Sequence, residues 1–395
     1  MKHTTSKLRL GDITRFVSGG TPSKQVPRYW GGSTPWVSAK DLKSLHVDSS
    51  IDTLTDAGRD AASLVPRGTL LILVRGMTLF KSIPIGIASR ELAINQDLKG
   101  LITNDAVSPE FLAYSLLAKE SELLQMVEAA GHGTGRLDTD ALKDVLVRVP
   151  SPPEQHQIAS AIATWDTAIQ KKEQLIAAKA KRKAALMAEL LTGRRRLAGF
   201  QTAWRSWHLG ELFRERVETN RKDLPLLSIT REEGVVPRSS LERKDTSNAD
   251  KSKYLRICPG DIGYNTMRMW QGVSALSHHE GVVSPAYTVC IPGPEIDGTF
   301  VSYLFKLPEV VHLFYRYSQG LTSDTWNLKF HHFAAITVRI PEPDEQVAIA
   351  SLLSILDEEL ALIKQQRDAL VQQKRGLMHK LLTGQWRLPV QEEVN

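Results

Sequence analysis

Loops in two long segments of the chain, residues 8–149 (the first block) and 204–340 (the second block), combine cations, amides, hydroxyls and aromatic rings. Arginine, lysine and asparagine can form hydrogen bonds with the edges of nucleic-acid bases, and hydroxyls and backbone N–H groups bind phosphates. The candidate binding residues are Ser18, Gly20, Thr21, Ser23, Lys24, Tyr29, Trp36, Lys40, Arg75, Lys81, Thr134 and Arg136 in the first block, and Asn265, Arg268, Trp270, Ser323, Trp326 and Lys329 in the second. The alternative is that the tryptophans are core residues and the cations are solvated.

No catalytic motif is found in the sequence. There is no GxxxxGK(S/T) phosphate loop and no HExxH motif, and the glycines of 131–135 lack the strand, helix and downstream acid of a dinucleotide-binding unit. The Ser-Pro-Ala-Tyr run at 284–287 lacks the leading Asn or Asp of an amino-methyltransferase motif. The adjacent pairs His278–His279 and His331–His332 suit one metal ion poorly. We therefore expect no catalytic residue, metal or cofactor in this chain, and an output that is binding.

The composition is that of a soluble globular protein, with 42% hydrophobic and 24% charged residues in a length that suits two or three domains. No apolar run approaches the roughly 18–20 residues that cross a bilayer, and the N-terminus lacks the apolar segment of a secretion signal. Only Cys258 and Cys290 are present, which excludes a disulfide framework. We expect a cytoplasmic protein. The net charge of +6 is concentrated in residues 150–197, which contain nine Lys and Arg but only four acidic residues.

Residues 150–197 align without gaps onto residues 341–388 at a constant offset of 191, with 19 identities in 48 positions. Such an ungapped match indicates an internal repeat. Each copy begins with prolines and acidic residues and ends in Leu-Leu-Thr-Gly followed by basic residues, which is the pattern of one long helix. About 38 helical residues would make a rod of about 57 Å, the length of a spacer.

The apolar residues of both copies recur with a mean spacing of 3.5, which predicts two helices that pair as a coiled coil. The alternative is two amphipathic helices, each packed on its own domain. Lys172, Lys179 and Lys183 interrupt the apolar seam of the first helix at its middle, and we expect their side chains to extend outward to solvent. The predicted pairing residues are Ile158, Ile162, Trp165, Ile169, Ile176, Leu186 and Leu190 in the first helix, and Ile349, Leu353, Leu356, Leu360, Ile363, Leu370, Leu377 and Leu381 in the second.

The two blocks share a frame but have dissimilar interiors. Both open alike, with Leu-Gly-Asp-Ile at 10–13 and Leu-Gly-Glu-Leu at 209–212, and both have a β-branched segment after a glycine turn. Helical stretches are predicted at 111–127 and 300–317, and closing strands at 145–150 and 336–341. A shared frame with different loops is expected if each block reads a different target, and equally of any old duplication.

The chain resembles the specificity (S) subunit of type I restriction–modification systems over essentially its whole length. The resemblance rests on residues 10–23, on the Tyr-Trp-Gly-Gly and Pro-Trp segments at 29–36, on the two helix starts with Glu154-Gln155 and Glu345-Gln346, and on the two Leu-Leu-Thr-Gly ends. It implies an α+β fold in which two mixed α/β target-recognition domains are joined by two long helices forming an antiparallel coiled coil, as a pseudo-twofold repeat. The corresponding domains are residues 1–149, 150–197, 198–340 and 341–388, with a C-terminal tail at 389–395.

The resemblance also implies a function. Each target-recognition domain would read one half of a split site in double-stranded DNA, and the helices would fix the gap between the halves and dock two modification subunits. Two restriction subunits would then join. S-adenosylmethionine, ATP and Mg²⁺ are expected only in those partners. The same pseudo-twofold order predicts that Leu388–Val390 lie near the start of the first block. The alternatives are a coiled-coil adaptor that binds only proteins and a stand-alone DNA methyltransferase.

Overall fold

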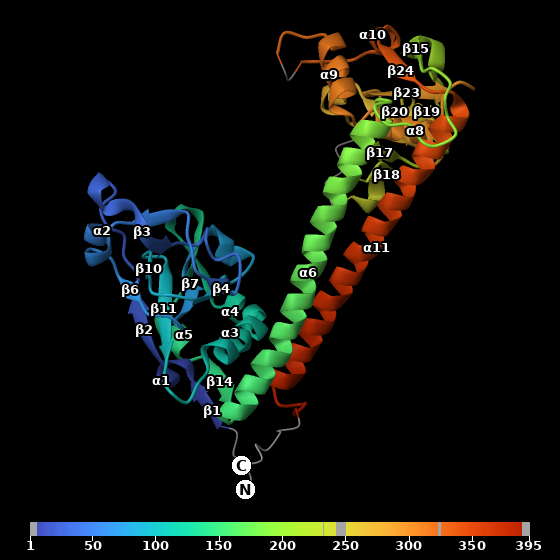
Figure 1. Ribbon diagram of the computed structural model, residues 1–395. Coiled ribbons are helices and arrows are strands. Elements are labelled where there is room, and N and C mark those ends of the chain that lie inside the picture. Colours follow the sequence, from blue (N-terminus) through green and yellow to red (C-terminus); the bar gives the residue numbers. More distant parts are fainter. Residues whose placement is uncertain (1–5, 232, 242–249, 323–324, 389–395) are drawn as a thin grey trace. The chain divides into compact units, whose positions relative to one another are not determined.

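The computed structural model describes residues 6–231, 233–241, 250–322 and 325–388 (Figure 1). The chain divides into two compact units, of which unit 1 comprises residues 1–173 and 365–395, and unit 2 comprises residues 174–364. Each unit therefore contains one block together with half of each long helix. This division differs from the predicted one, which separates the helices from the blocks. The predicted contact of Leu388–Val390 with the first block falls mostly outside the described residues, as does the predicted tail at 389–395.

The two copies of the repeat form the two longest helices of the described chain, α6 (Pro152–Leu190) and α11 (Pro343–Leu382). Each helix begins at a proline, whose fixed φ suits the first helical turn. Each ends before a glycine with positive φ, Gly193 at 71° and Gly384 at 78°. A left-handed residue at this position lets following backbone N–H groups cap the last helical carbonyls. The repeated Leu-Leu-Thr-Gly is therefore a helix stop.

α6 and α11 pack side by side and run antiparallel (Figure 1). Lys172 donates to Gln366 over 2.7 Å, and Lys183 forms an ion pair with Asp357. The later residue of α6 therefore contacts the earlier residue of α11, as antiparallel packing requires. All fifteen predicted pairing residues are buried or half-buried. The predicted fold class, two mixed blocks joined by a pair of antiparallel helices, is confirmed.

The prediction for the three lysines of α6 is wrong. Lys172, Lys179 and Lys183 do not extend outward, because each side chain reaches across to an acceptor on α11. In the same order, these acceptors are Gln366, Glu359 and Asp357. The sequence of α6 alone could not reveal them, since the oxygen atoms belong to the other copy of the repeat. The lysines therefore contribute to helix pairing.

The first block, within the described residues, is built from small sheets and short helices. Its sheets are β2-β11-β7-β9-β4, β5-β3-β10-β6, β12-β13-β8 and β1-β14. The strands are β1 (Ser6–Arg9), β2 (Thr14–Ser18), β3 (Trp30–Val37), β4 (His46–Val47), β5 (Asp52–Leu54), β6 (Leu64–Val65), β7 (Leu70–Leu73), β8 (Arg75–Gly76), β9 (Ile85–Ala88), β10 (Leu92–Ile94), β11 (Leu98–Thr103), β12 (Val127–Ala130), β13 (Thr134–Leu137) and β14 (Leu146–Val149). The helices are α1 (Leu10–Ile13), α2 (Asp56–Asp60), α3 (Pro109–Ala118), α4 (Glu120–Gln125) and α5 (Thr139–Lys143), with 3-10 turns η1 (Pro27–Tyr29), η2 (Met77–Phe80) and η3 (Gly131–Gly133).

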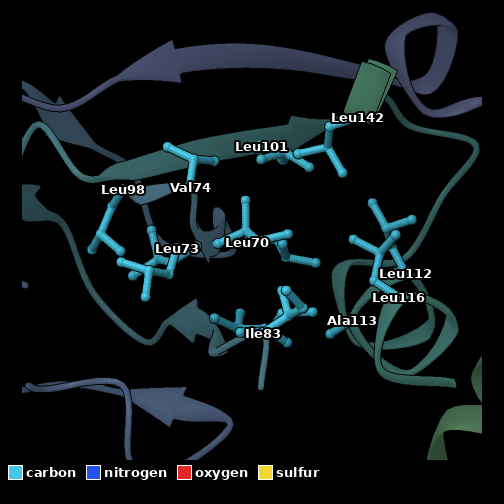
Figure 2. Close-up of a cluster of buried hydrophobic side chains, with 14 of the residues drawn as sticks. Leu70, Leu73, Val74, Ile83, Leu98, Leu101, Leu112, Ala113, Leu116 and Leu142 are labelled. Atoms are coloured by element: carbon cyan, nitrogen blue, oxygen red, sulfur yellow. The ribbon is translucent and has the colours of Figure 1, made fainter. Parts of the chain in front are cut away.

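The core of the first block lies between the central strands and helix α3. All four residues of β7 are buried, as expected of a strand covered on both faces. Figure 2 shows Leu70, Leu73, Leu98 and Leu101 from the sheet with Leu112, Ala113 and Leu116 on the helix side of the same cluster. This core gives the loops at the strand ends a rigid base.

The second block repeats this plan with less regular structure. Its sheets, within the described residues, are β16-β23-β20-β21, β15-β24, β17-β18 and β19-β22. The strands are β15 (Arg205–His208), β16 (Phe213–Glu215), β17 (Leu227–Ile229), β18 (Val235–Pro237), β19 (Leu255–Ile257), β20 (Ile262–Asn265), β21 (Ser274–Leu276), β22 (Gly281–Val283), β23 (Tyr287–Pro292) and β24 (Thr337–Ile340). The helices are α7 (Leu209–Leu212), α8 (Gly298–Leu304), α9 (Pro308–Tyr317) and α10 (Phe330–Ala334), with 3-10 turns η4 (Arg238–Ser240) and η5 (Met269–Gln271). Each predicted helical stretch, at 111–127 and 300–317, is in fact two helices.

The shared opening of the two blocks has one structural reason. In each block the first strand pairs with the last, β1 with β14 and β15 with β24. The turn of helix that follows packs closely on a second short helix: a Cβ on Gly11 would lie 3.1 Å from Lys143 Cβ, and one on Gly210 would lie 2.9 Å from Ala334 Cβ. Glycine in Leu-Gly-Asp-Ile and Leu-Gly-Glu-Leu therefore lets the neighbouring helix pack this closely.

A buried glutamine joins each block to the long helix that follows it. Gln155 donates from Nε2 to the carbonyls of Ala106 and Pro150, and its Oε1 accepts from the N–H of Ser108. Gln346 makes the same three bonds. Its partners are Glu295, Pro341 and Asp297, and all six distances lie between 2.8 and 2.9 Å. Ser108 and Asp297 are the N-caps of α3 and α8, so each glutamine ties the start of a domain helix to the start of a long helix.

Candidate functional site

The loop at 18–24 of the first block is held in shape by two tryptophans. Trp36 donates from Nε1 to the carbonyl of Gly20 over 3.0 Å, and Trp30 donates to that of Ser23 over 3.2 Å. The two rings meet edge to face at 5.2 Å, and Lys24 Nζ lies 5.7 and 5.6 Å from their centroids. Trp36 is only 5% exposed. It therefore supports the loop from below, while the exposed Lys24 offers its charge to a ligand.

A second group of candidates follows strand β7. The sheet β12-β13-β8 places Arg136 directly opposite Arg75, although 61 positions separate them in the sequence. Arg136 pairs with Asp138 at 3.3 Å, and N–H groups of Ala141 and Asp140 lower the pKa of that carboxyl. Arg75 is exposed and forms no ion pair within the described residues. It is therefore available to an external anion.

The turn at residues 95–97 connects these two groups. Thr21 is hydrogen-bonded to Gln96, and Val74, the residue before Arg75, donates its N–H to the carbonyl of Asp97 over 2.8 Å. Ser18 accepts from Lys99, just beyond the turn, over 2.6 Å. The structure therefore brings Ser18, Gly20, Thr21, Ser23, Lys24, Arg75 and Arg136 into neighbouring loops of one block. Lys81 is the residue after η2, and the Thr134 hydroxyl donates to the carbonyl of Gly131 before β13. Among the described residues, no hydrogen bond or ion pair links the side chain of Tyr29 or Lys40 to this group.

Sequence reasoning missed two apolar residues on the same loop. Met77 is 73% exposed and Phe80 is 52% exposed, and between them the fully buried Leu79 anchors the 3-10 turn η2. Two large apolar side chains exposed on one ordered loop make that loop a candidate contact surface. The available signal was their position, directly after the buried strand β7 and between Arg75 and Lys81.

The second block has the same arrangement at its equivalent strand. After β20, Met267 is 42% exposed, Met269 is fully buried and Trp270 is half-buried, at the same spacing as Met77, Leu79 and Phe80. Trp270 packs edge to face on Trp326 at 5.1 Å, and Trp326 packs on Tyr315 at 4.8 Å. Together with the bond from the N–H of Arg268 to the carbonyl of Asn265 over 3.0 Å, these contacts bring Asn265, Arg268, Trp270 and Trp326 near one another. Lys329 is the exposed N-cap of α10, and Ser323 lies outside the described residues.

Ion pairing separates the cations of the second block into two kinds. Arg216 binds Asp261 and Glu218, and Arg256 binds Glu218 and Glu280. The hydrogen bond from Asp261 raises the pKa of Arg216, so this guanidinium is committed to the fold. Arg268 and Lys329, in contrast, are exposed and have no acidic partner in the part of the chain that the structure describes. Both are therefore available to an external anion.

No catalytic or metal-binding group emerges from the described residues. No cluster of three metal-ligating side chains is found among them, and the rings of His331 and His332 lie against each other at 4.0 Å. Burial raises the pKa of the Cys290 thiol well above its ordinary value, which disfavours the reactive thiolate. No helix in the described ranges is long and apolar enough to span a membrane. What the described loops present is a set of exposed cations and apolar side chains on each block.

Comparisons with known proteins agree on one family. Residues 3–178 match the type I restriction modification DNA specificity domain. The chain is 30% identical over 161 residues to the type I restriction enzyme EcoR124I/EcoR124II specificity subunit of Escherichia coli, and 32% identical over 174 residues to the MjaIX specificity subunit of Methanocaldococcus jannaschii. These matches cover 40% and 42% of this chain and 40% and 38% of the relatives. The chain thus spans about two fifths of the length of the curated relatives it matches.

Solved structures extend the likeness in fold to nearly the whole chain. A type I restriction–modification S subunit from M. genitalium superposes with a TM-score of 0.55 at 15% identity, covering 96% of both chains. A chain from a structure of type I restriction–modification complex assembly gives a TM-score of 0.57 at 15% identity, covering 97% of this chain and 99% of that one. At this identity the likeness concerns the fold. The family resemblance predicted from the sequence is confirmed.

Proposed function

We propose that this chain, whose residues 3–178 match the type I restriction modification DNA specificity domain, is the DNA-recognition subunit of a type I restriction–modification complex. Each block is a recognition domain that reads one half of a bipartite site in double-stranded DNA. The chain itself performs no catalysis, and the complex acts on DNA in the cytoplasm.

One observation carries the proposal. Both blocks present, directly after a buried central strand, a loop with an exposed methionine, an aromatic ring and a cation without an acidic partner in the described residues. Cations bind the phosphate backbone, and apolar side chains contact thymine methyl groups or insert between base steps. The rest of each loop differs between the blocks, which suits two different half-sites.

The long helices have a second role in this proposal. Because α6 and α11 run unbroken through both units, their length sets the number of base pairs between the half-sites. They also dock two modification subunits, which carry the S-adenosylmethionine chemistry. Two ATP-dependent restriction subunits complete the complex.

A domain exchange tests the recognition role. Residues 8–149 would be replaced by the corresponding block of another S subunit, and the methylated adenines would be mapped across the genome of cells that produce the complex. We expect one half of the methylated sequence to change and the other to remain. A change in both halves would contradict modular reading. No methylation with the unmodified chain would favour a protein-binding adaptor, whereas methyl transfer by the isolated chain would favour a methyltransferase.

A paired insertion tests the spacing role. Seven residues would be inserted after Glu173 in α6 and seven after Lys364 in α11, which lengthens both helices and keeps the 3.5-residue seam in phase. Seven residues add about 10 Å, so we expect the gap to grow by about three base pairs while both half-sequences stay the same. A four-residue insertion near Ala180 alone is the matched control, because it breaks the register. An unchanged gap with intact binding would show that the helices do not measure it.

A further inference from the structure

Two clusters of the same three residue types lie where the blocks meet the helices. The first clamp consists of Tyr114, Asp166 and Lys374, and the second clamp of Tyr303, Asp357 and Lys183. In each clamp the tyrosine hydroxyl donates to the aspartate over 2.8 Å. The lysine forms an ion pair with the same aspartate, through its other oxygen. The lysine Nζ also lies near the tyrosine ring, 5.5 Å from its centroid in the first clamp and 5.1 Å in the second.

Each clamp joins three separate segments of the fold. Tyr114 is on α3, Asp166 on α6 and Lys374 on α11. In the second clamp, Tyr303 is on α8 and the helices exchange roles, since Asp357 is on α11 and Lys183 on α6. All three residues of either clamp belong to one compact unit. A clamp therefore links a domain helix to both long helices at one point.

The surroundings make these contacts directional. Both lysine side chains are 16% exposed, and the aspartates are 40% and 47% exposed. Burial raises the pKa of Tyr303 to about 12 and that of Tyr114 further, so both hydroxyls stay protonated donors. Neighbouring apolar residues such as Phe111, Ile158 and Leu381 contribute burial, which does not depend on direction. The hydrogen bond and the ion pair depend on angle, and they select one orientation.

The clamps are also the second fixed point of each domain. The buried glutamines attach the domains at Gln155 and Gln346, and the clamp aspartates lie 11 residues further along the same helices. Eleven helical residues span about 16 Å. A domain held only at the glutamine could pivot on the helix surface, whereas two points this far apart oppose rotation.

We propose that the two clamps are positioning sites that set the angle of each recognition domain on the helix pair, and thereby the number of base pairs accepted between the half-sites. This rests on the proposed function. A rotation of about 6° moves a loop about 30 Å away, the width of a small domain, by about 3 Å, close to one base pair. Small changes in clamp geometry are therefore enough to alter the accepted gap.

The test uses Tyr114→Phe and Tyr303→Phe, singly and together, in the full chain assembled with its modification subunits. Binding would be measured on DNA with the preferred gap and with gaps one base pair shorter and longer. We expect each substitution to lower the preference for the correct gap by about tenfold and the pair by about a hundredfold, since distant sites add. Affinity for the preferred DNA should change by less than about threefold. Tyr317→Phe on α9 is the matched control, because that hydroxyl forms no hydrogen bond within the described residues.

Two further pairs of variants separate positioning from stability. Asp166→Asn and Asp357→Asn keep the side-chain shape but remove the charge, and should relax the gap in the same way. Lys183→Arg and Lys374→Arg keep the positive charge and should preserve the preference for the correct gap. An equal loss of affinity on all three DNAs, or an unchanged preference, would overturn the clamp proposal alone. A parent complex that bound no bipartite DNA would overturn the proposed function, and this inference with it.

Discussion

The two halves of the chain are alike where a domain is attached and different where a surface is offered to a ligand. Three features recur in both halves: the buried glutamine with its three bonds, the glycine of the first short helix (Gly11 and Gly210), and the Tyr-Asp-Lys clamp. The loops after β7 and β20 keep the spacing of their apolar residues but differ in their polar ones. Attachment depends on bonds with fixed geometry, which tolerate few residue types, whereas the proposed recognition surfaces would change with their targets.

One attachment differs between the halves. Glu154 of α6 is paired with Arg148 from the strand before it, at 2.6 Å, whereas Glu345 of α11 is paired with Arg196 from the linker after α6. Trp204 also donates from Nε1 to Glu345, and the Trp204 ring lies against Gly193. In unit 1 the place beside the equivalent Gly384 is filled by the guanidinium of Arg148. The same helix end is therefore covered by an aromatic ring in one half and by a cation in the other.

The largest effect is expected from the shared glutamines. Gln155→Leu and Gln346→Leu would each leave one N–H and two carbonyls without their partner in a buried site. We expect each to lower the free energy of unfolding of its own unit by about 3 kcal/mol or more. Urea unfolding followed by hydrogen exchange would assign the loss to a unit.

The control for this pair is Gln170→Leu, because Gln170 is exposed in the middle of α6 and makes no side-chain hydrogen bond within the described residues. It should be close to neutral. A large loss at Gln155 with none at Gln346 would show that the two halves are not attached in the same way.

The arginines sharpen the difference between the halves. Arg148→Ala would remove the partner of Glu154, whose side chain is only 13% exposed, together with a contact to the carbonyl of Leu381 at 3.4 Å. We expect a loss of about 2 to 3 kcal/mol in unit 1. Arg339→Ala at the equivalent, exposed position should cost less than about 1 kcal/mol, because Glu345 keeps Arg196. Equal losses in thermal unfolding would contradict the different roles assigned to these two arginines.

The loops after β7 and β20 provide the next comparison. Replacing Met77 and Phe80 by alanine should weaken DNA binding by about tenfold or more, with the loss traced to one half-site. Replacing Met267 and Trp270 should do the same for the other half-site. Competition with DNA altered in one half at a time would assign each loop to a half-site. The exposed Ile51 is the control, since it lies on a different loop, between β4 and β5. A uniform loss across all competitors would mean that the loops contact the backbone and not the bases.

The sequence predicted the fold well because the repeat carries most of its architecture. A constant offset and a 3.5-residue spacing were enough for the helix pair, and Leu-Leu-Thr-Gly was enough for both helix ends. The site was harder, because its members come from loops far apart in sequence, as Arg75 and Arg136 do. Met77 and Phe80 are apolar, and they stand out as candidate site residues only because the structure shows them exposed. The lysines of α6 were misjudged because their partners lie on another helix.

The smallest effect is expected at the middle of the helix pair, where the two copies differ most. Lys172→Met and Lys179→Met would remove contacts to Gln366 and Glu359 but keep apolar stems, so stability should change by less than about 1 kcal/mol. The effect of the two substitutions on partner choice should be larger.

If α6 paired with α6 of a second molecule, Lys179 would face Ala168, the repeat equivalent of Glu359, and lose its acceptor. The lysines therefore favour α11 as partner, and the double variant should self-associate at concentrations where the parent chain does not, as light scattering would detect. A strictly monomeric variant that is also markedly less stable would assign these lysines to stability and not to partner choice.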